Sequence, residues 1–204
     1  MDPYTKLSDE SIKYNKKILT DIFEYQNFNL SKLRILDIGS GSGGWTIASA
    51  IIAKKGYLYG IEPSDSMLKD ARNNKKIFIP KLNNIKFFKG NGINLHFKNE
   101  NQFDVILYMK SLHNMNKQDA TESLNLSKNL LKKKGIILFR FPIWDKDSKI
   151  KIQNDFIRDR IKLIEEFASV NKFKFLKYKT IYYNKPIGEN KAIGFLQFGI
   201  KKTN

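Results

Sequence analysis

Hydrophobic and polar positions alternate along this chain with two periods, one typical of buried strands and one typical of amphipathic helices. Short apolar runs predict strands over 33–38, 57–61, 85–88, 104–108 and 136–141. Apolar positions at helical spacing predict helices over 10–25, 44–54, 64–73, 117–132 and 150–170. The stretch 75–82, interrupted by Pro80, stays ambiguous. Strands that alternate with helices predict an α/β fold, a parallel sheet with helices on both faces.

The end of the chain departs from this alternation. The stretches 173–183 and 192–201 predict two strands joined by a turn at NKPIGEN, and therefore an antiparallel hairpin. No linker or low-complexity tract interrupts the chain, so we expect a single domain over 1–204. No stretch is long and apolar enough to span a membrane, and the N-terminus lacks the apolar part of a signal peptide. We therefore predict a cytoplasmic protein.

The segment ILDIGSGSGGW, residues 35–45, reads as a buried strand that enters a glycine-rich turn and then a helix. Gly39, Gly41 and Gly43 lie where the backbone must bend sharply and approach a ligand, because glycine adopts positive φ without steric cost. The helix that follows would point its first N–H groups at that ligand. With Gly44, these glycines also fit the G-x-G-x-x-G pattern of dinucleotide enzymes, so the turn alone predicts only a nucleoside-containing cofactor.

Two acidic residues favour S-adenosylmethionine (SAM) over NAD. Asp37 lies on the strand just before the first glycine, where its carboxylate can face the ammonium group that SAM carries. NAD has no ammonium group near its pyrophosphate. Glu62, about twenty residues past the turn, can accept hydrogen bonds from both ribose hydroxyls.

Later motifs make the chain resemble the class I SAM-dependent methyltransferases, most closely the branch that includes the quinone-biosynthesis enzymes. The stretches that carry the resemblance are GNGINLHF at 90–97, FDVIL at 103–107, SLHN at 111–114 and LLKKKGIILFRF at 130–141. The resemblance implies a doubly wound, Rossmann-like sheet of seven strands, mostly parallel, that ends in the antiparallel hairpin. It also implies an N-terminal helical cap over 1–30, a cofactor-binding core over 33–141, and a C-terminal helix and hairpin over 150–201.

The resemblance further implies which residues contact SAM. They are Asp37, Gly39, Ser40, Gly41, Gly43, Glu62, Pro63, Asn91, Gly92 and Met109. Asn91 replaces the family's usual aspartate, and its carbonyl oxygen can still accept a hydrogen bond from the adenine amino group. His96 stands where proline is usual, and Asn114 stands where a second histidine is common.

The candidate catalytic residues Lys110, His113 and Arg140 follow or end the predicted fourth and fifth strands. Lys110 and Arg140 are either two solvated basic residues or an anion clamp for a carboxylate or phosphate on the substrate. His113 is either a general base, since its reference pKa is near neutral, or a residue that shapes its loop. Candidate apolar contacts to a ligand come from aromatic residues, Tyr14, Trp45, Tyr108 and Phe141.

Composition narrows the chemistry. The chain has no cysteine, which excludes disulfides, thiolate metal sites, radical SAM chemistry and pyrimidine C5 methylation through a cysteine nucleophile. The fourth strand ends in Tyr108-Met109-Lys110, without the acidic residue that would hold magnesium, so we expect no metal. It also lacks the Asn/Asp-Pro-Pro-aromatic motif used on base amines and glutamine amides.

The formal net charge of +17 invites a nucleic-acid partner. However, only five residues are arginine and the lysines are spread along the chain, so a nucleic acid is not favoured. We therefore predict a SAM-dependent methyltransferase that methylates O, N or an activated carbon of a small molecule, with an anionic acceptor as one option. An RNA methyltransferase and a non-catalytic SAM-binding partner subunit stay open as alternatives.

Overall fold

The computed structural model of the chain describes residues 7–93, 97, 101–144, 148–176, 179–187 and 192–203. The first half contains α1 (Asp9–Tyr25), η1 (Leu30–Lys32), β1 (Arg34–Ile38), α2 (Gly44–Ile52), β2 (Tyr57–Glu62), α3 (Asp65–Phe78), β3 (Ile85–Lys89) and β4 (Phe103–Met109). The second half contains η2 (Leu112–Asn114), α4 (Lys117–Leu130), β5 (Leu131–Trp144), α5 (Ser148–Val170), β6 (Phe173–Phe175), β7 (Lys179–Ile187) and β8 (Ala192–Lys202).

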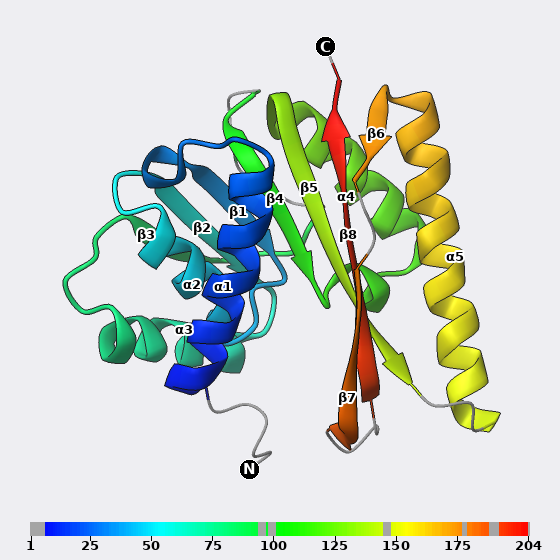
Figure 1. The fold of residues 1–204 in the computed structure, drawn as a ribbon, viewed down its shortest axis with the longest axis horizontal. Coiled ribbons are helices and arrows are strands. Elements are labelled where there is room, and N and C mark those ends of the chain that lie inside the picture. Colours follow the sequence, from blue (N-terminus) through cyan, green and yellow to red (C-terminus); the bar gives the residue numbers. More distant parts are fainter. Residues whose placement is uncertain are drawn as a thin grey trace.

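One sheet runs through the molecule in the order β3-β2-β1-β4-β5-β8-β6, with β7 also paired to β8 (Figure 1). Strands β1 to β5 are all parallel to one another, and β8 pairs with β5 in the antiparallel direction. Strands β6 and β7 pair with successive parts of the same edge of β8 and so occupy one position in the sheet. The eight described strands therefore form a sheet that is seven strands wide. The predicted seven-stranded, mostly parallel sheet with a C-terminal antiparallel hairpin is therefore confirmed.

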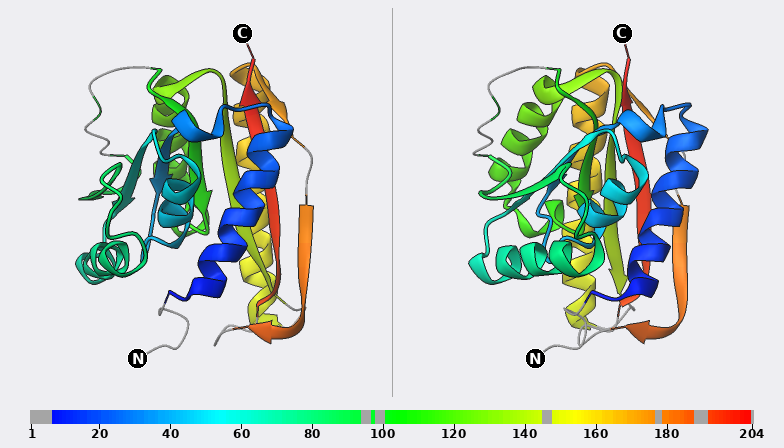
Figure 2. Two further views of the ribbon diagram at one scale, coloured as in Figure 1. Left: turned by 60° about the vertical axis from the view of Figure 1, so that its left-hand side comes forward. Right: turned by 90° about the vertical axis from the view of Figure 1, so that its left-hand side faces the viewer.

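Helices cover both faces of this sheet (Figure 2). Buried side chains of α1, α2 and α3 pack on one face with Ile35, Leu107 and Leu138. Buried side chains of α4 and α5 pack on the other face with Ile106 and Phe139. Neighbouring positions of a strand serve different faces because successive side chains point to opposite sides. The doubly wound arrangement predicted from the alternating pattern is thus present.

Local capping explains where the helices begin and end. Ser8 caps α1, since its Oγ accepts a hydrogen bond from Ser11 N at 3.2 Å. Ser64 caps α3 in the same way through Met67 N at 3.4 Å. This helix ends before Pro80, which disfavours helical geometry in the residue that precedes it. The start of the ambiguous 75–82 stretch is therefore helical, and α3 is longer than the predicted 64–73.

The prediction of one continuous strand over 173–183 is wrong. Phe175 pairs with Ile200 of β8, and the next described strand begins at Lys179, which pairs with Gln197. The chain thus advances by one residue more than β8 between these pairs, which breaks the ladder into β6 and β7. The apolar alternation also shifts by one residue here, from Phe173 and Phe175 to Leu176 and Tyr178, so the sequence carried a local signal of the break that the prediction overlooked.

Some predictions fall outside the described residues. His96 is one of them, and residues 188–190 of the predicted NKPIGEN turn are others. Among the helices that the structure describes, none has the length and apolar character needed to cross a membrane.

Candidate functional site

The glycine turn lies between β1 and α2 and has the backbone geometry that the sequence predicted. Gly39, Gly41 and Gly43 have φ of +73°, +54° and +88°. A Cβ at Gly39 would overlap Cβ of Ser111, so the turn is tight at this point. A Cβ at Gly41 would find only Met67 Cε at 4.0 Å. The turn is therefore closed by protein at Gly39 and open at Gly41.

Asp37 is completely buried at the end of β1. Its Oδ2 accepts a hydrogen bond from Thr46 Oγ1 at 2.7 Å, whereas Oδ1 has no hydrogen-bond partner among the described residues. Burial raises the pKa of Asp37 to about 7, and the negative charge of Glu62 contributes to the same increase. A cationic group beside Oδ1 would relieve this cost.

Two hydroxyl groups next to the turn are, like Asp37 Oδ1, buried without a hydrogen-bond partner among the described residues. The Oγ atoms of Ser40 and Ser111 are buried and make no hydrogen bond within the described part of the chain. Ser111 packs directly against Gly39, so its hydroxyl group lies beside the glycine turn. Buried polar atoms without partners are rare in folded proteins, and their clustering marks a place for a polar ligand.

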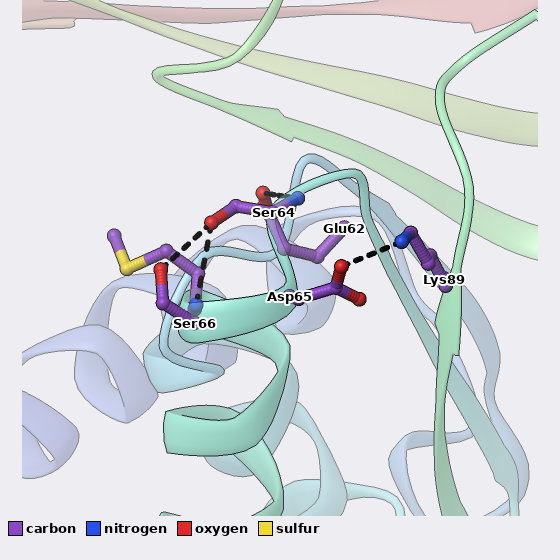
Figure 3. Close-up of polar contacts among 6 residues, drawn as sticks. Glu62, Ser64, Asp65, Ser66 and Lys89 are labelled. Atoms are coloured by element: carbon purple, nitrogen blue, oxygen red, sulfur yellow. Dashed lines mark hydrogen bonds and ion pairs between the residues drawn. The ribbon is translucent and has the colours of Figure 1, made fainter.

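Glu62 ends β2 and links this strand to the glycine turn and to α3. Its Oε2 accepts a hydrogen bond from Gly41 N at 2.8 Å, and its Oε1 accepts one from Ser64 N at 3.0 Å. Figure 3 shows Glu62 beside Ser64 at the start of α3. A carboxylate oxygen can accept more than one hydrogen bond, so both oxygens can still bind ligand hydroxyl groups.

Figure 3 also shows an ion pair, Lys89–Asp65, that joins the end of β3 to the start of α3. Lys89 Nζ at the end of β3 lies 2.6 Å from Asp65 Oδ2 in the first turn of α3. Both side chains are exposed, and exposed ion pairs stabilise proteins only slightly. Pro63, a predicted cofactor contact, is also exposed beside them.

The other predicted cofactor residues lie after β3 and at the end of β4. The loop after β3 is held to β2, because Gly90 N donates to Glu62 O at 3.2 Å. In this loop Asn91 is exposed and Gly92 is buried. A Cβ at Gly92 would lie only 2.6 Å from Ser123 Oγ. Met109 is buried at the end of β4. All these residues lie at the carboxyl ends of parallel strands, the edge where α/β sheets bind ligands.

The structure brings the candidate catalytic residues Lys110 and Arg140 together, and His113 lies near enough for the charge of Lys110 to affect its pKa. Arg140 is buried in β5, and Lys110 follows β4 with its N donating to Arg140 O at 2.9 Å. His113 lies in η2, with its ring 6.2 Å from that of Phe141. Burial, then the charges of Lys110 and Arg160, lower the pKa of His113 to about 4. Its imidazole is therefore neutral near pH 7 and is only a weak base.

The aromatic candidates fall on different faces of the sheet. Tyr108 is fully buried under α4, and its hydroxyl group hydrogen-bonds with Ser123 and Ser127 at 2.7 and 2.8 Å. The expectation that Tyr108 forms a wall of the acceptor site is wrong. In contrast, Tyr14 and Trp45 both contact the guanidinium group of Arg140.

Sequence reasoning missed two residues that the fold brings to this edge and one that supports Asp37. Thr46 binds Asp37, and its place in the first turn of α2 was an available signal. Phe195 and Gln197 lie on β8 beside Arg140, far from it in the sequence. Apolar and polar residues alternate around them as in any other strand, so no local sequence signal identified Phe195 and Gln197 as site residues. Among the residues described, His, Asp and Glu side chains form no group of three that could bind a metal.

Comparisons with known proteins indicate the family of this domain. Residues 35–135 match a family model described as "Methyltransferase domain". The chain contains a methyltransferase domain. The matched range includes the glycine turn, Glu62, the loop after β3 and Lys110. Curated protein sequences give no match.

Solved structures share the fold of this methyltransferase chain. A SAM-dependent methyltransferase from Aquifex aeolicus matches with a TM-score of 0.67 and 15% identity, covering 96% of this chain and 99% of that one. Magnesium protoporphyrin IX methyltransferase from Synechocystis PCC 6803, solved with SAH, matches with a TM-score of 0.67 and 13% identity over 97% and 89%. TYW2 of M. jannaschii, in complex with AdoMet, matches with a TM-score of 0.59 and 17% identity over 97% and 78%.

Proposed function

We propose that this methyltransferase transfers the methyl group of SAM to an oxygen, nitrogen or activated carbon atom of a small molecule. S-adenosylmethionine is the cofactor. The observation that carries the assignment in this chain is the buried Asp37 carboxylate, whose Oδ1 has no partner among the described residues. An ammonium group is the partner that such a carboxylate favours, and SAM has one whereas the pyrophosphate region of NAD does not.

The residues at the glycine turn fit the remaining groups of SAM. Glu62 would accept hydrogen bonds from the ribose hydroxyls while its backbone contacts fix the direction of both oxygens. Asn91 would accept a hydrogen bond from the adenine amino group. Gly41 leaves open space where the main chain faces the ligand.

Held by Asp37, Glu62 and Asn91, SAM would supply a methyl group on a positively charged sulfur, with S-adenosylhomocysteine (SAH) and a proton from the acceptor as the other products. The protein's contribution is alignment of the acceptor and exclusion of water. His113 is neutral near pH 7, so it can accept that proton, although its low pKa makes it a weak base.

Calorimetry with SAM, SAH and NAD tests the cofactor assignment. We expect SAM and SAH to bind and NAD not to bind. Tight NAD binding without SAM binding would overturn it. A screen of metabolite pools with methyl-labelled SAM then tests the small-molecule assignment, and a labelled product of low molecular mass is the expected result.

A finer assignment within the family rests on the sequence. The loop Ser111–Asn114 resembles the L-H-H loop of the quinone-biosynthesis branch, which would make a ring carbon or a ring hydroxyl the methyl acceptor. Labelled-product analysis with phenolic compounds tests this finer proposal. Exclusive labelling of non-aromatic compounds would contradict it.

An RNA methyltransferase is the second candidate, because a basic hollow lies beside the edge strand β3. The hollow has a volume of about 530 Å³, and its lining includes four basic residues, Arg72, Lys75, Lys76 and Lys86. Two of them already bind main-chain oxygens of β3: Arg72 donates to Phe87 O and Lys75 to Ile85 O. The lining includes no residue of the glycine turn, so the small molecule remains the favoured acceptor.

A further inference from the structure

Three strands bring polar side chains together beyond the cofactor residues. At the carboxyl end of β4, Met109 pairs with Arg140 of β5, and Arg140 pairs in turn with Gln197 of β8. Directly paired residues of neighbouring strands have side chains on the same face. Lys110 follows Met109 and is hydrogen-bonded through its main chain to Arg140. Figure 1 shows β4, β5 and β8 side by side at this place.

Arg140 is held by aromatic rings from three separate elements. Its guanidinium carbon lies 4.0 Å from the ring centroid of Phe195 on β8. It lies 5.1 Å from that of Trp45 in α2 and 5.6 Å from that of Tyr14 in α1. Aromatic rings contact the flat face of a guanidinium group, whereas its hydrogen-bond donors lie in the plane. These three rings surround the guanidinium group of Arg140 and hold it in place.

Lys110 brings a second positive charge to the same ring. Its Nζ lies 5.6 Å from the Phe195 centroid. Desolvation, then the charge of Arg140, lowers the pKa of Lys110 below its ordinary value. Two cations against one ring repel each other, and an anion bound between them would relieve this repulsion. Lys110 keeps some exposed surface, so solvent reaches the site on its side, although its ammonium group is partly desolvated.

Gln197 gives an independent indication of a ligand. It is only 4% exposed, and its Oε1 has no hydrogen-bond partner among the described residues. A buried amide oxygen without a donor costs free energy. A hydroxyl or amino group of a ligand seated beside Arg140 would satisfy it.

We propose that the methyl acceptor is a small molecule with an anionic oxygen group, a carboxylate or phosphate, which Lys110 and Arg140 bind beside Phe195, and with a separate hydrogen-bond donor that Gln197 accepts. This inference rests on the proposed function, since it names the acceptor class of that site. It adds Phe195 and Gln197 as residues that determine specificity.

Binding of benzoate to the SAH-loaded protein tests the anion site, with benzamide as the neutral probe of the same shape. We expect benzoate to bind and benzamide not to bind measurably. Lys110→Gln and Arg140→Gln should each weaken benzoate binding about tenfold, the usual effect of losing one charge-assisted hydrogen bond. SAH affinity should stay within about twofold of wild type, because neither residue is among the cofactor contacts.

Lys55→Gln is the matched control, because it removes the same charge from an exposed residue between α2 and β2 that lies in neither the proposed site nor the basic hollow. Benzoate affinity should not change in this variant. Equal benzoate affinity in wild type and Lys110→Gln would overturn the proposal, even if Arg140→Gln fails to fold. Absence of benzoate binding to SAH-loaded wild type would also overturn it, whereas absence of SAH binding would overturn the proposed function itself.

The hydroxybenzoates test the role of Gln197. At least one isomer should bind wild type more tightly than benzoate, and this difference should disappear in Gln197→Met, which keeps the length of the side chain but lacks the amide. Benzoate itself should bind Gln197→Met as it binds wild type. If no hydroxybenzoate binds more tightly than benzoate, or if the difference survives in Gln197→Met, the assignment of Gln197 is wrong.

Discussion

At the scale of single residues, Asp37 shows a conflict between stability and ligand binding. Among the described residues, Thr46 is the hydrogen-bond partner of this buried carboxylate, and burial raises its pKa to about 7. A neutral side chain would suit this place better in the free protein. We infer that the carboxylate is kept because the ligand, not the fold, supplies its partner.

Asp37→Asn should therefore stabilise the free protein near pH 8 and abolish SAM binding. Relieving a pKa shift of this size is worth up to about 4 kcal/mol, and Asn can still accept a hydrogen bond from Thr46. Urea unfolding and SAM calorimetry measure the two effects. Asp104→Asn is the control and should destabilise the protein, because Asp104 is already paired with Lys132 Nζ and Arg34 N, both at 2.8 Å. Unchanged SAM affinity in Asp37→Asn would contradict this prediction.

Asp37 and His113 should also shape the dependence of stability on pH, with opposite signs. The folded pKa of Asp37, about 7, exceeds the ordinary 3.8, so its contribution to stability is present below pH 3.8 and is lost as the pH rises to 7. The folded pKa of His113, about 4, lies below the ordinary 6.5, so stability is lost as the pH falls from 6.5 to 4.

Single variants should separate these two contributions. Relative to wild type, the stability of Asp37→Asn should fall more steeply as the pH drops from 6.5 to 4. The stability of His113→Gln should fall more steeply as the pH rises from 4 to 7. Urea midpoints measured across this range check both slopes, and parallel curves for the three proteins would refute the assignment.

At the scale of elements, α1 packs on the sheet through buried residues and places the aromatic ring of Tyr14 beside the proposed acceptor site. Leu19 and Phe23 are fully buried in the core shared with α2. Tyr14 on the same helix contacts Arg140. The hydrophobic face of α1 therefore determines whether Tyr14 reaches the site.

Leu19→Ala should lower the free energy of unfolding by about 2–5 kcal/mol, the usual cost of truncating a buried leucine. Benzoate affinity should fall as well, because a loosened α1 no longer holds Tyr14 against Arg140. Urea unfolding and calorimetry measure these effects. Lys16→Ala, at an exposed position of the same helix, should change neither. Normal benzoate affinity in a destabilised Leu19→Ala would show that α1 does not contribute to the acceptor site.

At the scale of the whole molecule, the net charge of +17 is the feature that the small-molecule proposal leaves unused. Among the described ion pairs, Lys89–Asp65 and Lys132–Asp104 neutralise single lysines, and each is local. Most lysines thus contribute to a general positive potential, which attracts polyanions without selecting one.

RNA binding should therefore be weak and should depend steeply on salt. We expect affinity for a single-stranded RNA at low salt and loss of that affinity near physiological salt, since counterion release drives such binding. Filter binding at several salt concentrations measures this dependence. RNA affinity that persists at physiological salt, with methylation of the RNA, would favour the RNA methyltransferase instead.

The sequence alone determined the order of the elements, the mostly parallel sheet and the closing hairpin. It also predicted the positive φ of Gly39, Gly41 and Gly43. These features depend on local rules: the period of apolar positions, the sterics of glycine and the capping of helices by neighbouring residues. The approach of Asp37 and Glu62 to one turn followed from the strand–turn–helix pattern for the same reason.

Only the tertiary structure decided which distant residues share a site. The contact of Tyr14, Trp45 and Phe195 with Arg140 joins α1, α2 and β8 around β5. Strand register decides such contacts, because a shift by one residue turns every side chain to the other face. The same register placed Tyr108 under α4, which no local pattern in the sequence encodes. The division of the predicted strand into β6 and β7, in contrast, coincides with a one-residue shift of the apolar alternation between Phe175 and Leu176.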